Sequence, residues 1–288
     1  MSRTAGPRAK RGGPLDSWAL LAVPGILFLG AFFLLPLVKM GVRSFTDPSP
    51  ANYKVFIETP LYFKVLWTTI RTSFIVTVVC VLVGYPYAYM MHHAGGKGRA
   101  ALAALVLVPF WSSLLVRTYA WTVLLQSSGV VNTLLKDLGV IKQPLALMRN
   151  ILGVTIGMTH ILLPFMVLPI YATMRRIDPD LVPAAEGLGA GPRAAFRKVF
   201  LPLSLPGVFA GSLLVFVLAL GFYITPAVLG SPQNSMFSEL VVNMVSQRLQ
   251  FGTGSALAMT LLLVTLVLLG IGSRFVKIGQ TLGYEADR

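Results

Sequence analysis

The stretch that decides the fold is ILGVTIGMTHILLPFMVLPIYAT, residues 151–173, which contains no Asp, Glu, Lys or Arg. An α-helix rises about 1.5 Å per residue, so a helix of this length crosses a hydrocarbon core of about 30 Å. Five further runs are predominantly apolar and similar in length, at residues 18–40, 65–91, 101–125, 205–228 and 255–275. We therefore predict an all-α polytopic membrane protein with six transmembrane helices.

The composition also indicates a lipid environment. Hydrophobic residues make up 55% of the 288-residue chain and charged residues 12%, with a mean hydropathy of +0.75. Soluble domains carry about 25% charged residues. The net charge of +14 would suit a nucleic-acid-binding protein, but the basic residues lie in short segments between the apolar runs, where they set membrane orientation. Cys80 is the single cysteine, which excludes an internal disulfide and a cysteine-based metal site.

The distribution of basic residues predicts the topology. With the N-terminus inside, the majority of the 24 Lys and Arg residues fall in inner segments. We therefore expect both termini in the cytoplasm. Residues 1–17 then form a basic cytoplasmic tail, residues 18–275 the six-helix transmembrane domain and residues 276–288 a cytoplasmic C-terminal tail.

The connection between the fourth and fifth runs, about residues 175–204, is too long and too patterned for a plain connector. An Asp-Pro pair at Asp178 is typical of an N-cap and first helical position, and Gly189 can adopt the left-handed conformation that ends a helix. Pro192 favours the first turn of a second helix, which Pro202 is expected to stop. We predict a bent helix pair on the cytoplasmic surface.

Within this connection, Ala184-Ala185-x-x-x-Gly189-Ala190, Phe196 and Leu201-Pro202-x-x-x-Pro206 resemble the Glu-Ala-Ala loop of binding-protein-dependent ABC importer permeases. The resemblance implies a type I ABC importer-like bundle, with a cytoplasmic coupling helix between helices 4 and 5 that docks into a groove on the ATPase subunit. It assigns contact with the ATPase to Ala184, Ala185, Glu186, Gly189, Ala190 and Phe196. Pro183 stands where the family has its glutamate, so the sequence departs from the pattern at that position.

Four further stretches resemble the spermidine/putrescine type of permease: GYPYAY at 84–89, VPFWSSLLVRTYAW at 108–121, LPFMVLP at 163–169 and TPAVLG at 225–230. The resemblance implies import of a small organic solute from periplasm to cytoplasm by alternating access. Polyamines such as spermidine and putrescine are the expected substrates, and opines, phosphonates and other small organic ions are the alternatives.

The same resemblance implies the partners of the chain. They are two ATPase subunits, a second permease subunit that makes a heterodimer, a periplasmic substrate-binding protein and the lipid bilayer of a bacterial inner membrane. No nucleic-acid partner is expected. No Gly-x-x-x-x-Gly-Lys-Ser/Thr phosphate loop occurs, so ATP and Mg are expected on the partner ATPase and no cofactor on this chain.

No paired catalytic acids, nucleophile with a base, or metal-ligand spacing occurs, so we predict neither a catalytic residue nor a metal site. The rival hypothesis is a stand-alone secondary transporter driven by an ion gradient. Such a protein is expected to carry acidic or histidine relays within its spans. His160 is the only titratable group that we place centrally.

Polar and aromatic residues within the apolar runs are the candidates for the substrate pathway: Trp111, Arg117, Tyr119, His160 and Tyr223. Two of them have structural alternatives. Arg117 suits the membrane interface as a snorkelling side chain, and His160 suits a hydrogen bond between helices. Gly207 and Gly211 form a Gly-x-x-x-Gly pattern that predicts close helix packing.

Overall fold

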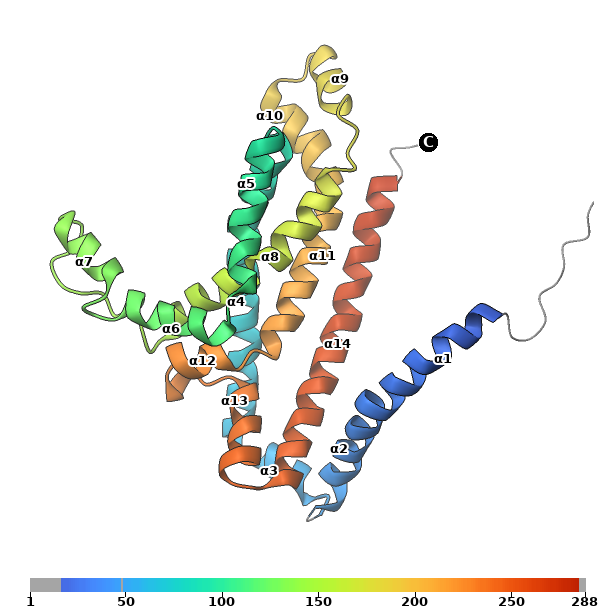
Figure 1. Cartoon of the computed structure of the whole chain (residues 1–288), viewed down its shortest axis with the longest axis vertical. Helices are drawn as coiled ribbons and strands as arrows, with labels where there is room; N and C mark the ends of the chain where they lie inside the picture. The colour runs from blue at the N-terminus through green and yellow to red at the C-terminus, as the bar shows by residue number, and fades with distance from the viewer. Residues whose placement is uncertain (1–16, 48, 285–288) are drawn as a thin grey trace, which may run out of the picture.

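The computed structural model describes residues 17–284 except residue 48, and within this part every regular element is helical. Figure 1 shows the arrangement. The α-helices are α1 (Ser17–Leu29), α2 (Leu35–Thr46), α3 (Ala51–Glu58), α4 (Pro60–His93), α5 (Gly96–Leu107), α6 (Leu114–Leu125), α7 (Val130–Asp137), α8 (Ile151–Met174), α9 (Leu181–Gly187), α10 (Pro192–Ala195), α11 (Leu201–Leu220), α12 (Ile224–Leu229), α13 (Phe237–Val242) and α14 (Phe251–Tyr284). Three π-helical turns and two 3₁₀ turns complete the order: η1 (Gly30–Leu34), η2 (Val108–Trp111), η3 (Phe196–Phe200), η4 (Pro232–Asn234) and η5 (Asn243–Gln247).

The predicted fold class is confirmed, with one difference in the third apolar run. In the described part of the chain, five continuous helical stretches are long and apolar enough to cross a membrane: Ala22–Thr46, Pro60–His93, Ile151–Met174, Pro192–Leu220 and Phe251–Arg274. The third run is instead a broken pair, Gly96–Trp111 and Leu114–Asp137, bent by 102°.

The break has a local cause in the sequence around Pro109. This proline lacks a backbone donor, and the chain tightens into η2, where the Ser112 N–H donates to the Pro109 carbonyl at 3.1 Å. Ser112 and Ser113 are then extended, with ψ of 151° and 137°, before α6 begins. Two extended residues redirect the chain, so α6 and α7 leave the bundle sideways (Figure 1).

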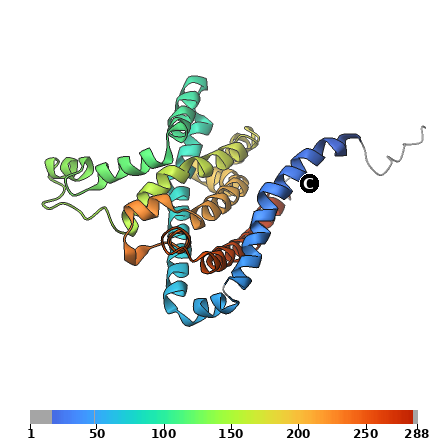
Figure 2. The same cartoon turned by 60° about the horizontal axis from the view of Figure 1, so that its bottom comes forward.

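Helices α4, α8 and α11 form the centre of the bundle (Figures 1 and 2). Their shared core is rich in fully buried methionine, including Met91, Met158, Met166 and Met174. Helix α11 lies close to α8 at two glycines. A Cβ on Gly207 would lie 2.9 Å from Ile170 Cα, and one on Gly211 would lie 2.9 Å from Met166 Sδ. Both glycines of the Gly-x-x-x-Gly pattern therefore lie at a helix contact within this subunit.

A second, smaller core lies at the opposite end of α4 from the α9–α10 loop, where α3, α13 and α14 meet (Figure 1). Tyr62, Phe237 and Leu257 are buried there. The Phe237 N–H donates to Thr69 Oγ1 at 2.8 Å, which fixes the start of α13 against α4. Residues far apart in the sequence thereby close the non-loop end of the bundle.

The first span has a different character from the rest. Its large apolar side chains, among them Phe28, Phe32 and Phe33, are exposed along the described part of the stretch. Helix α14 runs on to Tyr284, so the tail predicted at 276–288 begins within a helix. Residues 1–16 and 285–288 lie outside the described residues.

Candidate functional site

The loop between α8 and α11 begins with a turn at Asp178. Its Oδ1 accepts the Asp180 N–H at 2.9 Å, and its carbonyl accepts the Leu181 N–H at 3.3 Å. The prediction of Asp178 as a helix N-cap is therefore wrong, because this side chain closes an Asx turn and α9 starts three residues later. Pro183 lies in the first turn of α9, where its missing donor removes no helical hydrogen bond.

Helix α9 ends at Gly187, and Gly189, two residues later, has a φ of +91°. The Gly189 N–H donates to the Glu186 carbonyl at 2.9 Å, and the Ala190 N–H donates to the Ala185 carbonyl at 3.1 Å. These bonds satisfy carbonyls that the helix end leaves free. No heavy atom lies within 4 Å of a Cβ built on Gly189, so the backbone conformation, and not space, selects glycine there.

The second limb of the loop runs straight into the fifth span. The prediction that Pro202 stops this limb is wrong, because α10, η3 and α11 form one continuous helical stretch, Pro192–Leu220. In the π turn η3, the Leu201 N–H donates to the Phe196 carbonyl, five residues back. This wider turn shifts the hydrogen-bond register just before Pro202, so the missing proline donor interrupts no α-helical bond.

Aromatic side chains join this second limb to the end of α4. The Tyr89 ring lies edge-on to Phe196 and Phe200, with centroids 5.5 Å and 5.3 Å away, and Phe196 stacks on Phe200 at 5.8 Å. Phe200 is buried. One helical turn further along α11, the Ser204 hydroxyl hydrogen-bonds the Tyr85 hydroxyl at 2.9 Å. The limb is thus fixed to α4 by tertiary contacts.

The first limb is exposed at its tip. Ala184, Glu186 and Gly189 are exposed, whereas Ala185 and Ala190 are half-buried. Leu188, between two glycines, is 90% exposed and is the most prominent apolar side chain of the loop. Leu188 was not predicted from the sequence, although an apolar residue flanked by glycines at a helix end is a recognisable pattern.

Three elements meet on the other side of the bend at Pro109. The Trp121 Nε1–H of α6 donates to His160 Nδ1 of α8 at 3.2 Å, and the Thr118 hydroxyl of α6 lies 3.1 Å from the Thr225 hydroxyl of α12. Arg117, also on α6, is half-buried, and its Nε has no hydrogen-bond partner in the described part of the protein.

The structure therefore separates the pathway residues predicted from the sequence. Arg117 and His160 belong to the junction of α6, α8 and α12, and the His160 bond to Trp121 has the geometry of the interhelical alternative. Trp111 and Tyr119 are 80% and 59% exposed, and Tyr223, just before α12, is 39% exposed. Sequence reasoning missed the partners Thr118, Trp121 and Thr225 because their contacts join helices distant in the sequence.

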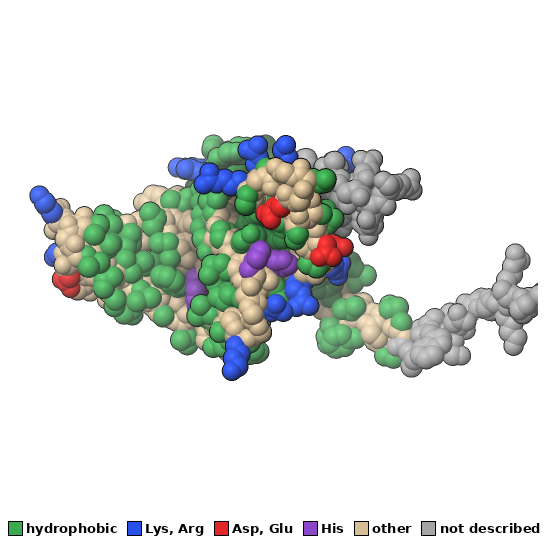
Figure 3. Space-filling model, turned by 90° about the horizontal axis from the view of Figure 1, so that it is seen from above, with side chains coloured by type: hydrophobic (Ala, Val, Ile, Leu, Met, Phe, Trp, Pro, Cys, Tyr) green, Lys and Arg blue, Asp and Glu red, His purple; other side chains and the backbone are tan. Residues whose placement is uncertain are grey.

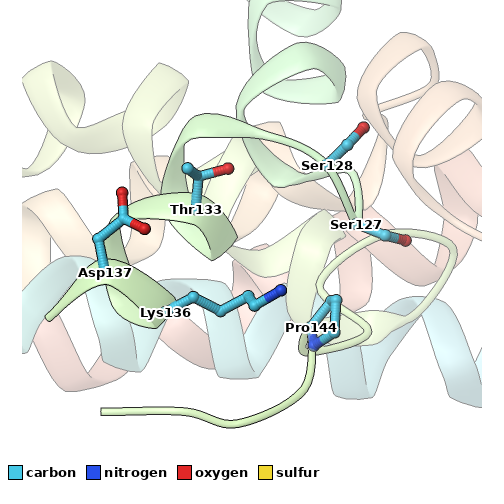
Figure 4. Close-up of a pocket in the computed structure, with 6 residues that line it drawn as sticks. All are labelled: Ser127, Ser128, Thr133, Lys136, Asp137 and Pro144. Atoms are coloured by element: carbon cyan, nitrogen blue, oxygen red, sulfur yellow. The ribbon is translucent and has the colours of Figure 1, made fainter. Parts of the chain in front are cut away.

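A polar cleft of about 470 Å³ lies at the far end of the sideways arm formed by α6, α7 and the following loop. Figure 4 shows the Lys136 side chain reaching toward Pro144, while the Asp137 carboxylate lies apart from it. Asn132 fixes this arm, since its side chain donates to the carbonyls of Gln126 and Leu145 and accepts the Leu145 N–H at 2.7 Å.

Within the described residues, no group of three or more His, Cys, Asp and Glu side chains is arranged to hold a metal ion. The site therefore consists of two separate regions. One is a loop with an exposed tip and a fixed base, and the other is a junction of polar side chains at a bent span.

Known proteins resemble the chain over most of its length. Residues 17–275 match the family described as binding-protein-dependent transport system inner membrane component. The spermidine/putrescine transport system permease protein PotB of Haemophilus influenzae is 33% identical over 255 residues, which cover 87% of this chain and 88% of PotB. The inner membrane ABC transporter permease protein YdcU of Escherichia coli is 34% identical, with coverage of 88% and 85%.

A solved structure has the same fold at low identity. A bacterial ABC transporter involved in the import of the acidic polysaccharide alginate has a chain that matches with a TM-score of 0.70 and 18% identity, covering 90% of this chain and 95% of that one.

Proposed function

The chain belongs to the family of binding-protein-dependent transport system inner membrane components, and on that premise we propose that it imports polyamines. It is the permease subunit of an ABC importer. The observation that carries the substrate class is the identity of 33–34% to PotB spermidine/putrescine permeases over 86–87% of the chain. Spermidine and putrescine are the substrates we expect.

ATP hydrolysis belongs, in this proposal, to two partner ATPase subunits that hold ATP and Mg. A second permease subunit completes the pathway as a heterodimer, and a periplasmic protein delivers the solute. ATP drives the cycle only if the two pathway states differ in their contacts with the ATPase. The exposed tip of the α9–α10 loop, with Ala184, Glu186 and Leu188, supplies those contacts.

The fixed base of the loop completes the coupling. Phe196 and Phe200 bind the second limb to Tyr89 of α4, so a displacement of the tip reaches the bundle through packed aromatic rings. Gly189 sets the angle between the limbs. We assign it the role of the joint that holds the tip in position for the ATPase.

Both termini lie in the cytoplasm in this topology, on the same side as the α9–α10 loop. Single cysteines in a Cys80→Ala background test it. Lys97→Cys and Arg193→Cys should be shielded from an impermeant thiol reagent in intact cells, whereas Lys142→Cys on the outer loop should react. Labelling of Arg193→Cys from outside would overturn the orientation.

One observation favours a second substrate class. The half-buried Arg117 has an Nε without a partner among the described residues and lies one helical turn from Trp121, which holds His160. A guanidinium in this setting suits a solute that carries a carboxylate or phosphonate group. An opine or phosphonate is therefore the alternative cargo.

Uptake of labelled spermidine by the importer in proteoliposomes distinguishes these substrates. We expect ATP-dependent uptake that excess unlabelled putrescine reduces and that excess opine or phosphonate leaves unchanged. Absence of ATP-dependent uptake of labelled spermidine, together with ATP-dependent uptake of a labelled opine or phosphonate, would reject the polyamine assignment and select the alternative.

A further inference from the structure

A cleft of about 470 Å³ lies beneath the α9–α10 loop, between the loop and the end of α4. Tyr89, Phe196 and Phe200 form its aromatic wall, Asp178 and Glu186 border it from the loop, and His93 borders it from α4. Glu186 belongs both to the exposed tip and to this cleft, whereas Asp178 and His93 border the cleft without being part of the tip.

The charges of the cleft differ from those around it. No Lys or Arg among the described residues lines it, although Lys97, Arg99, Arg175, Arg176, Arg193, Arg197 and Lys198 belong to the segments at this end. In Figure 3, acidic and histidine side chains lie toward the middle of this end, and basic side chains lie around them. The ion pair found in the described part of the protein joins Arg43 and Asp47, so neither Asp178 nor Glu186 is paired with a described Lys or Arg.

The aromatic wall complements the two carboxylates. Aromatic faces attract organic cations, and carboxylates form strong hydrogen bonds with ammonium groups. Asp178 uses one oxygen for the Asp180 N–H, and its other oxygen makes no hydrogen bond among the described residues. A cavity with aromatic walls and two carboxylates, and with histidines but no Lys or Arg among its described lining residues, suits a linear cation with primary ammonium groups.

We propose that this cleft binds a linear di- or polyamine from the cytoplasm, as a site separate from the translocation pathway. The choice of amine rests on the proposed function, because the cytoplasmic product of the importer belongs to this class. A bound amine bridges Asp178 and Glu186 of the loop and Tyr89 of α4. It therefore holds the loop against α4 and slows the transport cycle when the product accumulates.

The first test measures binding at the cleft itself, through the labelling rate of a nearby thiol, and does not depend on transport. The importer complex carries Cys80→Ala and His93→Cys, which places an exposed thiol at the edge of the cleft. Spermidine should slow labelling of this thiol by a membrane-impermeant reagent severalfold, while glutamate at the same concentration should not. Lys97→Cys, exposed but outside the lining, should label at the same rate with or without spermidine.

Asp178→Asn supplies the matched comparison, because Asn keeps the acceptor of the turn and removes the charge. It should weaken protection by spermidine about tenfold, which corresponds to the loss of one charged contact. Asp180→Asn removes the same charge two residues away, outside the lining, and should leave protection unchanged. No protection by spermidine, equal protection by glutamate, or equal effects of the two variants would each overturn the proposal.

The second test measures regulation. Proteoliposomes preloaded with spermidine on the cytoplasmic side should take up labelled substrate severalfold more slowly than empty ones, and Asp178→Asn should abolish the difference. Equal uptake rates in preloaded and empty proteoliposomes would overturn the regulatory role. Absence of polyamine uptake altogether would reject only the proposed cargo, since the labelling test decides the cleft independently.

Discussion

Two proline-containing joints in this protein behave in opposite ways. At Pro202 the helix continues through the π turn η3 into α11, while at Pro109 the chain passes through η2 and turns by 102°. The joint at Pro202 is surrounded by partners, since Phe200 is buried and its ring lies edge-on to Tyr89. The bend at Pro109 is open, with Phe110 48% and Trp111 80% exposed. Tertiary contacts, more than the proline itself, decide which joint stays straight.

The largest effect should come from removing the side-chain packing around the helix joint at Pro202. Phe200→Ala deletes a buried ring from the contact with α4 and should lower the free energy of unfolding by about 3–5 kcal/mol. Phe110→Ala at the open bend should cost about 1 kcal/mol or less, because its ring is half exposed already. Thermal unfolding in detergent measures both variants. Equal losses of stability would remove the basis of the comparison.

The next effect concerns the angle between the two limbs of the α9–α10 loop, which Gly189 sets. Gly189→Val forces a β-branched residue to φ of +91°, at a local cost of about 1–2 kcal/mol, and should reduce transport by about tenfold or more while the spans remain folded. ATPase pull-down and uptake are measured on the same preparation. Gly187→Val is the matched control, since Gly187 has open space and no positive φ. Normal transport and retained ATPase in Gly189→Val would make the loop a passive connector.

A smaller effect on stability and uptake should follow from a change at the junction of α6, α8 and α12. Trp121→Phe keeps a ring but removes the donor to His160, which should cost about 1 kcal/mol and reduce uptake severalfold if α6 lines the pathway. Trp67→Phe, at an exposed ring on α4, serves as the control. An uptake defect of the same size in both variants would show that the hydrogen bond has no specific role.

The smallest effect concerns Glu239 on α13, which accepts the Met236 N–H at 2.8 Å. Burial raises the pKa of this carboxyl, and the hydrogen bond from Met236 offsets part of the rise. The folded protein therefore holds the proton more tightly than the unfolded chain does, and stability falls as the pH rises from the ordinary pKa of a glutamate through the raised value. Glu239→Gln should flatten this dependence in thermal unfolding measured between pH 4 and pH 8. An unchanged slope would contradict the assignment.

The spans were predictable because hydropathy depends on composition within a short window. The same holds for Gly189, since the pattern of an apolar helix followed by glycine is local. The bend at Pro109 and the continuity at Pro202 were not predictable in this way. A proline removes the same donor at both positions, and the outcome depends on rings and helices that other parts of the chain supply.

The candidate functional residues also fall into a group that local sequence predicts and a group that only the tertiary structure reveals. The loop residues were predicted from a family resemblance that one segment carries. The bond between Trp121 and His160 joins α6 to α8, and the Asx turn at Asp178 replaces an N-cap that the dipeptide alone predicted. Trp121 and His160 are 39 residues apart in the sequence, so their hydrogen bond leaves no local pattern from which it could be predicted.

The methionines at the centre of the bundle have a mechanical consequence. A thioether side chain is unbranched and turns about three bonds, so it fills a gap of one shape as readily as another. Met158 and Met166 of α8 lie where α4 and α11 pack, and Gly211 brings the α11 backbone directly against Met166. If α11 shifts along α8, the methionine side chains can change rotamer and fill the new interface without leaving a cavity. The methionine core thus allows these helices to shift relative to one another while staying packed. Oxidation of the sulfurs to sulfoxides would make the side chains polar and hinder that movement.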